Sequence, residues 1–412
     1  MRFSNFLKNY EKTVLLILIF SLVFLIRLVF FVAMKDNPEA GETVEFSHTF
    51  LEEPFTNSYY QYFYWHGVLV TLERFPEYHY GDKILVRGVV EEVVSRKEND
   101  LLKRLAIKNP ELKKADSGAL AVVKVIRQKV LSVYKRTLPQ KEAGLLSGIV
   151  LGAGEGINKA FNDELKTTGM LHVVVASGSN VVLVSGMLFS LISSIVKRNY
   201  AILFTILGIF FYALLTGFDS PVVRASIMAS FAFGAQIFGR QKTALMALFF
   251  SGFFMLLVSP GLIVDIGFQL SFSATLGIIL FQKTISRLSQ ILPNIIKEDF
   301  STTIAAQIGS SPFLLFAFGK INLLSIFINL ILLWTIPIIM IFGGAAGVAG
   351  LVFPVLSVPI LYICYPFLLL FTNVVSFMSH FTIPISLTGA FFPITVLYYI
   401  ILVAVLFRRK NL

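Results

Sequence analysis

Cysteine and histidine are scarce in this chain of 412 residues. The one cysteine, Cys364, stands in an apolar run, so the sequence contains no disulfide framework and no cysteine-based metal or redox motif. The five histidines are isolated, and neither H-x-H nor H-E-x-x-H occurs. This excludes the histidine spacings of zinc hydrolases and zinc deaminases. We therefore expect neither a metal nor another cofactor.

The motifs of nucleotide hydrolysis and of acyl transfer are also absent. No G-x-x-x-x-G-K-[ST] phosphate loop occurs, and the glycines of Gly152–Gly156 lack both the lysine and the preceding strand of such a loop. A serine–histidine hydrolase built on His172 and Ser177 is disfavoured, because residues five apart lie about 140° apart around a helix and no oxyanion motif is adjacent. We do not expect an enzyme, so the energy for any transport must come from a partner or a gradient.

Charged residues are few and unevenly distributed. They make up 14% of the chain against 56% hydrophobic residues, and the mean hydropathy is +0.78, which is too apolar for a soluble domain. Residues 35–140 hold 16 Lys and Arg against 15 Asp and Glu, whereas residues 141–412 hold 15 against 8. The basic excess therefore belongs to the apolar part, where it orients membrane segments by the positive-inside rule or, alternatively, attracts a polyanion.

Long apolar runs begin near the amino terminus and return after residue 170. Thr13–Met34 is long enough to span a bilayer, and we expect residues 1–35 to form an uncleaved signal-anchor helix with a cytoplasmic amino terminus. Ala143–Leu151 is too short to span and is expected to be interfacial or re-entrant. The later apolar segments run roughly over residues 171–196, 200–217, 221–238, 243–258, 262–281, 301–318, 322–349, 354–378 and 392–407.

These segments predict a polytopic α-helical membrane protein. About nine to eleven membrane-embedded helices are expected, some of them short or broken by glycine and proline. Residues 351–412 should form the C-terminal transmembrane helices, with the carboxyl terminus in the cytoplasm. The lipid bilayer is then the first partner of the chain.

Residues 40–137 have a soluble composition and strand-like sequences. Phe63–Leu72 and Lys83–Val94 are rich in β-branched and aromatic residues, with a turn at Tyr80–Asp82 between them. Gly67 and Gly88 inside these runs suggest bulges, which curl a small sheet into a barrel. We predict a small extracytoplasmic β-barrel domain after the first helix, similar to an oligonucleotide-binding (OB) fold.

Aromatic and basic residues lie close together in this domain. Rings supply stacking faces for bases and cations follow phosphates, so the combination is typical of single-strand binding. The alternative is that the rings fill the core of the small barrel. The near-neutral charge of the domain indicates weak or transient contact. The candidate DNA-binding residues are Tyr64, Trp65, Arg74, Lys83 and Arg87.

Polar residues interrupt the first of the later apolar segments. Leu171–Gly186, LHVVVASGSNVVLVSG, contains His172, Ser177, Gly178 and Asn180 among valine and leucine. Polar groups at membrane depth are costly and usually face a cavity or another helix. Packing of small residues between helices explains glycine and serine, but explains histidine and asparagine less well. We expect a broken helix whose amides and small polar groups face a translocation path.

Two further polar clusters could line the same path. Asp219 precedes Ser220 and Pro221, a pattern typical of a helix start, so capping is an alternative role for this aspartate. Arg224 follows one turn into an apolar helix and needs a carboxylate, backbone carbonyls or an anionic guest. Asp265 and Gln269 form an i, i+4 polar stripe. An ion pair between Asp265 and Arg224 is a structural interpretation that is compatible with a conduction path.

Four segments, in order, resemble the ComEC competence family of DNA-uptake channels. The run GMLHVVVASGSNVVLVSG is similar to the family signature G-x-x-H-L-x-x-I-S-G-x-H. The other three segments are YALLTGFDSPVVRASIMA, SPGLIVDIGFQLSFSATLGIIL and TTIAAQIGSSPFLLFAFGKINLLSIFINLI. The resemblance covers about residues 143–350, and four ordered segments make it specific.

The resemblance implies that residues 140–350 form a competence (channel) domain. One DNA strand would cross the inner (plasma) membrane through it during natural transformation. The resemblance further implies an extracellular OB-fold domain that engages DNA, an outer DNA receptor, and a cytosolic ATP-driven translocase that pulls the strand. The residues expected to line the path, from these motifs and from the polar face of residues 172–186, are His172, Ser177, Gly178, Asn180, Asp219, Arg224, Asp265 and Gln269.

The chain departs from the family pattern in two ways. It stops at Leu412 without the H-x-H-x-D-H motif of the metallo-β-lactamase-like domain that many members carry, so a nuclease would have to be a separate partner. Asn180 replaces the second histidine of the signature, so a role that needs an ionisable imidazole does not transfer. Two alternatives stay open: a transporter of another anionic or amphipathic solute on the same scaffold, and a structural membrane protein that transports nothing.

Overall fold

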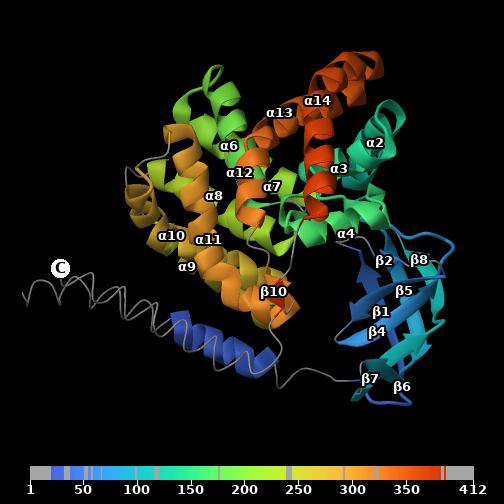
Figure 1. Ribbon diagram of the computed structural model, residues 1–412. Helices are drawn as coiled ribbons and strands as arrows, with labels where there is room; N and C mark the ends of the chain where they lie inside the picture. Colours follow the sequence, from blue (N-terminus) through green and yellow to red (C-terminus); the bar gives the residue numbers. More distant parts are fainter. Residues whose placement is uncertain are drawn as a thin grey trace, which may run out of the picture. The chain divides into compact units, whose positions relative to one another are not determined.

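The computed structural model describes residues 20–31, 38–50, 54–56, 59–65, 67–97, 100–115, 120–174, 177–237, 244–290, 293–318, 320–321, 324–381 and 385–386. The chain is mostly helical, with a small β-sheet region in its first third (Figure 1). It divides into two compact units: Leu25–Leu131, called here the β unit, and Met1–Phe24 with Ser132–Leu412, called the helical unit. The bounds of the four domains expected from the sequence stay predictions.

The described strands of the β unit pair as two sheets. Their orders are β1-β5-β8 and β2-β3-β4-β7-β6, and the neighbours are antiparallel except for β4 and β7. The closed OB-like barrel therefore stays a prediction. The strands are β1 (Thr43–Thr49), β2 (Phe55–Thr56), β3 (Tyr60–Trp65), β4 (Val68–Glu73), β5 (Lys83–Val89), β6 (Glu91–Lys97), β7 (Asp100–Lys108) and β8 (Glu111–Ala115).

The run Phe63–Leu72, predicted to be one strand, is a hairpin. The pairing of β3 with β4 ends at Trp65 opposite Val68. Gly67, in the short connection, has a φ of +87°. Tight hairpin connections need positive φ angles, which glycine adopts without steric cost. The glycine therefore marks a turn and not a bulge.

The predicted bulge at Gly88 is also wrong. β5 pairs with β1 in unbroken register from Lys83 to Val89, with this glycine opposite Val44. A Cβ atom at Gly88 would lie 2.5 Å from Cγ2 of Ile107. Close packing against the side chain from β7 therefore requires the glycine, and the ladder itself is regular.

Aromatic side chains of β1 and β3 pack together in the core of the β unit. The Phe46 ring stacks on Trp65 with centroids 3.9 Å apart, and the His48 ring stacks on Phe63 at 4.1 Å. Alternate residues of β3 point inward, and Tyr64 between them is exposed. This alternation is that of a strand with one buried face.

Most of the apolar segments predicted after residue 138 are helices. In the first of them, α3, almost every side chain is buried. The interfacial or re-entrant position expected for it stays a prediction. The helices are α2 (Leu120–Thr137), α3 (Gln140–Leu151), α4 (Lys159–Thr168), α5 (Leu171–Val174), α6 (Gly178–Ser193), α7 (Arg198–Thr216), α8 (Ser220–Ile237), α9 (Ala244–Val258), α10 (Ile266–Leu288), α11 (Asn294–Phe318), α12 (Ser325–Leu332), α13 (Thr335–Val352) and α14 (Pro354–Ser379). A short 3₁₀ turn, η2 (Pro260–Val264), precedes α10.

Two predicted segments are divided. Residues 322–349 contain α12 and α13 in place of one helix, and Pro337 lies in the first turn of α13, where its missing N–H costs least. The segment 171–196 is broken between α5 and α6, which confirms the expected broken helix. Of the first predicted helix, Phe20–Phe31 is described and helical. The predicted helix 392–407 lies outside the described residues.

Four segments of the described chain are long and apolar enough to cross a membrane. They are Leu171–Ser193, Arg198–Thr216, Thr335–Val352 and Pro354–Ser379, identified by length and composition. Helices α7 and α14 carry many exposed large apolar side chains, which a soluble protein would rarely leave in water. Shorter apolar helices occur at Phe20–Phe31 and Ala244–Val258.

Candidate functional site

The break between α5 and α6 places a helix amino terminus inside the helical unit. Ser177 precedes α6, but its side chain does not cap the α6 backbone. Its hydroxyl lies 2.7 Å from Ser179 Oγ and donates to Asn180 Oδ1 at 3.1 Å. The first amides of a helix have no acceptor within the helix and carry partial positive charge. The start of α6 is therefore suited to a negatively charged group.

Arg224 lies beside this helix start. It comes from the first turns of α8 and is 8% exposed. Its Nε donates to Ser271 Oγ on α10 at 2.7 Å, and its Nη1 lies 3.5 Å from Met228 Sδ. Its Nη2 lies 2.9 Å from the position that a Cβ atom at Gly178 would occupy. The guanidinium thus joins α6, α8 and α10.

No carboxylate within the described residues pairs with Arg224, so the predicted ion pair with Asp265 is wrong. Asp265 instead caps α10, because its Oδ1 accepts from Phe268 N at 2.7 Å. The same oxygen is 3.4 Å from Ser220 Oγ at the start of α8. A carboxylate at an N-cap satisfies the free amides of its own helix, and this local bond competes with a more distant arginine.

The remaining predicted path residues do not gather around Arg224. Asn180 is fully buried and donates from Nδ2 to the Ile149 carbonyl oxygen of α3 at 2.9 Å. His172 is exposed, and its Nδ1 lies 2.8 Å from the Gly169 carbonyl oxygen. Gln269 donates to the Ile263 carbonyl oxygen at 2.8 Å and so ties α10 to η2. Asp219 is half-buried just before α8.

The structure therefore brings two predicted residues, Gly178 and Arg224, together, while Ser177, next to Gly178 in the chain, bonds to Asn180. Ser271 completes this group and was missed by the sequence reasoning. A serine inside an apolar helix carries no distinctive pattern, and only the approach of α10 to α8 shows its role.

A second polar cluster joins α3, α4 and α14 and was also missed. Lys141 Nζ lies 3.3 Å from Glu164 Oε2 and donates to Ser376 Oγ at 2.6 Å. The buried Glu142 accepts from Thr372 Oγ1 at 3.1 Å. Lys141 and Glu142 stand at the start of α3 after Pro139, where their charges look like ordinary helix-end residues. The partners on α14, Ser376 and Thr372, lie more than 200 residues away, so no local pattern indicates them.

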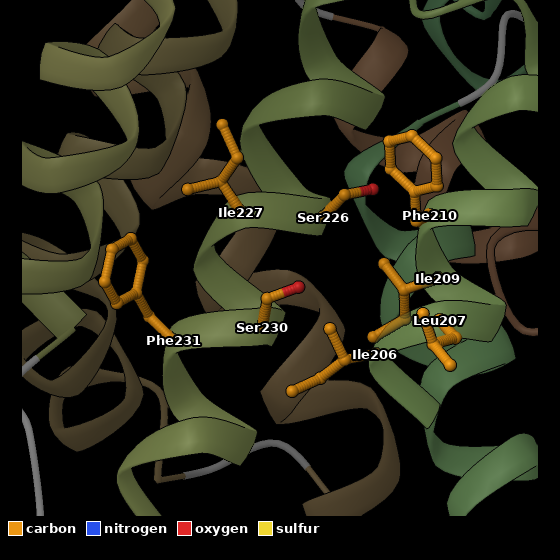
Figure 2. A pocket seen from close by; sticks show the side chains of 8 residues that line it. All are labelled: Ile206, Leu207, Ile209, Phe210, Ser226, Ile227, Ser230 and Phe231. Carbon is orange, nitrogen blue, oxygen red and sulfur yellow. The ribbon is translucent and has the colours of Figure 1, made fainter. Parts of the chain in front are cut away.

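An apolar groove of about 440 Å³ lies between α7 and α8. Figure 2 shows the hydroxyl groups of Ser226 and Ser230 directed toward the α7 side chains. The buried Ser226 hydroxyl has no hydrogen-bond partner in the described residues. The other lining residues are Ile206, Leu207, Ile209, Phe210, Ile227 and Phe231.

The candidate DNA-binding aromatic residues of the β unit do not share a face. Tyr64 is 53% exposed, whereas Trp65 points inward and stacks on Phe46. Tyr64 therefore offers a free ring to a base more readily than Trp65 does.

The three candidate DNA-binding cations of the β unit have different surroundings. Arg74 forms an ion pair with Glu77 at 3.0 Å. Arg87 stands in register between Glu45 on β1 and Glu111 on β8. Lys83 starts β5 opposite uncharged residues of both neighbouring strands. Of the three, Lys83 is thus the one whose cross-strand neighbours are uncharged.

These observations define a class of protein: a bundle of apolar helices, with broken elements and a buried arginine that no carboxylate of the described residues neutralises. In the described residues no group of three or more histidine, cysteine, aspartate and glutamate side chains is placed to hold a metal ion. A family model described as Competence protein matches residues 149–411, which is more than half of the chain. The chain therefore belongs to the competence protein family, of the ComEC type, as the four segments predicted.

Two curated relatives match parts of the chain. The ComE operon protein 3 of Bacillus subtilis (strain 168) is 25% identical over 228 residues, which cover 54% of this chain and 28% of that protein. An uncharacterized protein of Aquifex aeolicus (strain VF5) is 35% identical over 117 residues, which cover 28% of this chain and 27% of that protein. The chain thus spans little more than a quarter of the length of these relatives. No solved structure matches the chain significantly.

Proposed function

We propose that this protein spans the cytoplasmic membrane and conducts single-stranded DNA inward during natural transformation. Membership of the competence family supports the role, because the matched residues 149–411 include α6, α8 and α10. The four membrane-length segments and the exposed apolar faces of α7 and α14 support insertion in a bilayer.

The observation that best supports the proposal is that Arg224 is buried and has no carboxylate partner among the described residues. An ionised side chain removed from water is costly unless a counter-charge or hydrogen bonds replace its hydration. Here a serine and a methionine sulfur are the hydrogen-bond partners of the guanidinium, and a helix amino terminus lies beside it. Both features favour an anion, and the phosphates of a DNA strand are the anions that a competence protein would meet.

A transporter of another anion is the second candidate, because the same arginine suits any phosphate- or carboxylate-bearing solute. Competition separates the two. An excess of a mononucleotide should leave DNA uptake unchanged if the path is built for a strand, and should block it if the path is built for small anions. A structural protein without transport would show neither uptake nor competition.

The remaining features of the proposal concern partners and location. The protein would sit in the inner membrane with both termini in the cytoplasm and the β unit outside. It would receive DNA from an outer receptor and rely on a cytosolic ATP-driven translocase, and a separate nuclease would degrade the other strand. We propose no catalytic activity and no cofactor for this chain, which carries none of the motifs of nucleotide hydrolysis.

Transformation of the host tests the proposal. A deletion strain should lose DNA uptake, recover it when the gene is returned, and recover it poorly with Arg224→Gln at equal protein level in the membrane. A fluorescent single strand added outside cells measures entry directly. Undiminished uptake in the deletion strain would overturn the proposal.

A further inference from the structure

We infer that Arg224 and the first turn of α6 form a binding site for one phosphodiester group. The inference deepens the proposed function. It rests on that function for one point only, that a DNA strand brings its phosphates to this site. The site consists of the Arg224 guanidinium, the amides that begin α6 at Gly178 and Ser179, and the hydroxyls of Ser177 and Ser179.

The buried arginine has donors to spare. A guanidinium carries five N–H donors in a planar fork that matches two oxygens of a phosphate. Among the described residues only Nε makes a short hydrogen bond, to Ser271 Oγ at 2.7 Å, and the Nη1 contact with the Met228 sulfur at 3.5 Å is weak. Nη2 has no hydrogen-bond acceptor in the described chain, although the residue is 8% exposed. The open donors point to a ligand that the protein does not itself supply.

The helix start supplies a second, independent attraction for an anion. α6 runs for 16 residues, so its dipole is fully developed at Gly178. The side chain of Ser177 leaves the α6 backbone uncapped. Arginine and helix amino terminus are both positive, and placing them together is unfavourable unless an anion lies between them.

Gly178 is what permits this approach. A Cβ atom there would lie 2.9 Å from Arg224 Nη2 and 3.4 Å from the Cβ of Ala225. Any side chain would therefore push the guanidinium away from the helix start. The first turn of α6 exposes its backbone to the arginine in the way that glycine-containing phosphate sites expose theirs to a ligand.

Phosphodiester groups can reach this point from two sources, a nucleic-acid strand or an anionic phospholipid. The test uses the full chain in dodecyl maltoside micelles, which contain no phosphate. Binding of a labelled oligothymidylate is measured by anisotropy at several salt concentrations, and binding of phosphatidylglycerol by native mass spectrometry. The thermal shift caused by inorganic phosphate is a third readout.

The test compares two variants with one matched control. Arg224→Gln and Gly178→Ala should each weaken oligonucleotide binding by about 10- to 100-fold, the size of a lost charge-assisted contact. Arg224→Gln should also lower the slope of log affinity against log salt by about one charge. Gly186→Ala on the same helix should bind like the wild type, because a Cβ atom there meets nothing within 4 Å. If Arg224→Gln fails to fold, Gly178→Ala, which keeps the arginine, decides.

The outcomes separate the site from the function. Wild-type affinity and salt slope in both variants would overturn the site while the proposed function stands. If the wild type binds no oligonucleotide, the proposed function fails. The binding of phosphatidylglycerol and the thermal shift with inorganic phosphate then test whether the site exists. Phosphatidylglycerol binding or phosphate stabilisation that is lost in Gly178→Ala then supports a phosphate site, and an equal response in both proteins overturns it.

Discussion

The side-chain amide of Asn180 on α6 donates a 2.9 Å hydrogen bond to the carbonyl oxygen of Ile149 on α3. Ile149 belongs to the last turn of α3, where the helix runs out of N–H donors, and the amides at the C-cap bond to the carbonyls of Gly148 and Ser147 instead. Tyr212 on α7 donates to the next carbonyl, that of Val150, at 3.2 Å. The residue that departs from the family signature therefore holds a buried helix end, and this role needs a donor and no titrating group.

Replacing Asn180 should destabilise the helical unit. Asn180→Ala leaves the Ile149 carbonyl buried without a donor, which costs about 1–3 kcal/mol. Asn180→Asp should cost more, because a carboxylate cannot donate and would face a carbonyl oxygen. Thermal unfolding of the full chain in detergent measures the change. Ser193→Ala, an exposed position on the same helix, is the control, and equal melting of Asn180→Ala and this control would contradict the assignment.

Exchanging the charges of Arg224 and Asp265 should not restore stability. Arg224 contacts Ser271, whereas Asp265 caps α10 through Phe268 N. Arg224→Asp and Asp265→Arg remove two separate interactions, so the double variant should lose about the sum of the single losses. A double-mutant cycle of melting should give a coupling energy below about 0.5 kcal/mol. A coupling of several times that size would show that the two side chains pair.

The crossing of α10 and α11 should not tolerate a side chain. A Cβ atom at Gly277 would lie 2.3 Å from the Ala305 carbonyl oxygen, and one at Gly309 would lie 2.2 Å from that of Ser273. Because the obstacle is backbone, Gly277→Ala and Gly309→Ala should each cost about 1–3 kcal/mol or more. The yield of monodisperse protein and its melting temperature measure this. Gly344→Ala, whose Cβ would meet nothing within 4 Å, should behave as the wild type.

Low pH should destabilise the β unit through protonation of His48. Burial lowers the pKa of this imidazole, which stacks on Phe63. The unfolded chain, with a histidine pKa of about 6.5, then binds a proton more readily than the folded one, so stability is lost as the pH falls below about 6.5. Hydrogen exchange of the β1 and β3 amides in the full chain at pH 7.5 and pH 5 measures this. His48→Phe should reduce the difference, and the exposed His380→Gln should leave it unchanged.

Gln61 should hold the loop that follows β4. Its Nε2, with two N–H groups, lies 3.0, 2.9 and 2.9 Å from the carbonyl oxygens of Glu73, Arg74 and Pro76, and its Oε1 accepts from Tyr78 N at 2.9 Å. Gln61→Glu would set a carboxylate against three carbonyls and should destabilise the β unit by more than about 2 kcal/mol. Limited proteolysis at Arg74 measures how well the loop is held in place. Cleavage of Gln61→Glu as slow as that of the wild type would refute the dependence of the loop on Gln61.

Local patterns predicted the elements of this protein better than their contacts. The apolar runs located most of the described helices, and the polar cluster after Leu171 located the broken one. The pattern failed at Phe63–Leu72, because a hairpin and a single strand have the same alternation and only Gly67 separates them. It failed again at residues 322–349, where two apolar helices meet without a polar break.

The sequence by itself determined that this chain is an apolar, many-helix member of the competence family with a broken helix after Leu171, because composition, periodicity and motif order are local properties. Only the tertiary structure decided that Arg224 meets Ser271 and the start of α6, that Asp265 caps its own helix, and that Asn180 holds α3. Each of these polar groups had several possible partners of the right chemistry. The choice among them is made by the packing of helices that are distant in the sequence, which residue spacing does not encode.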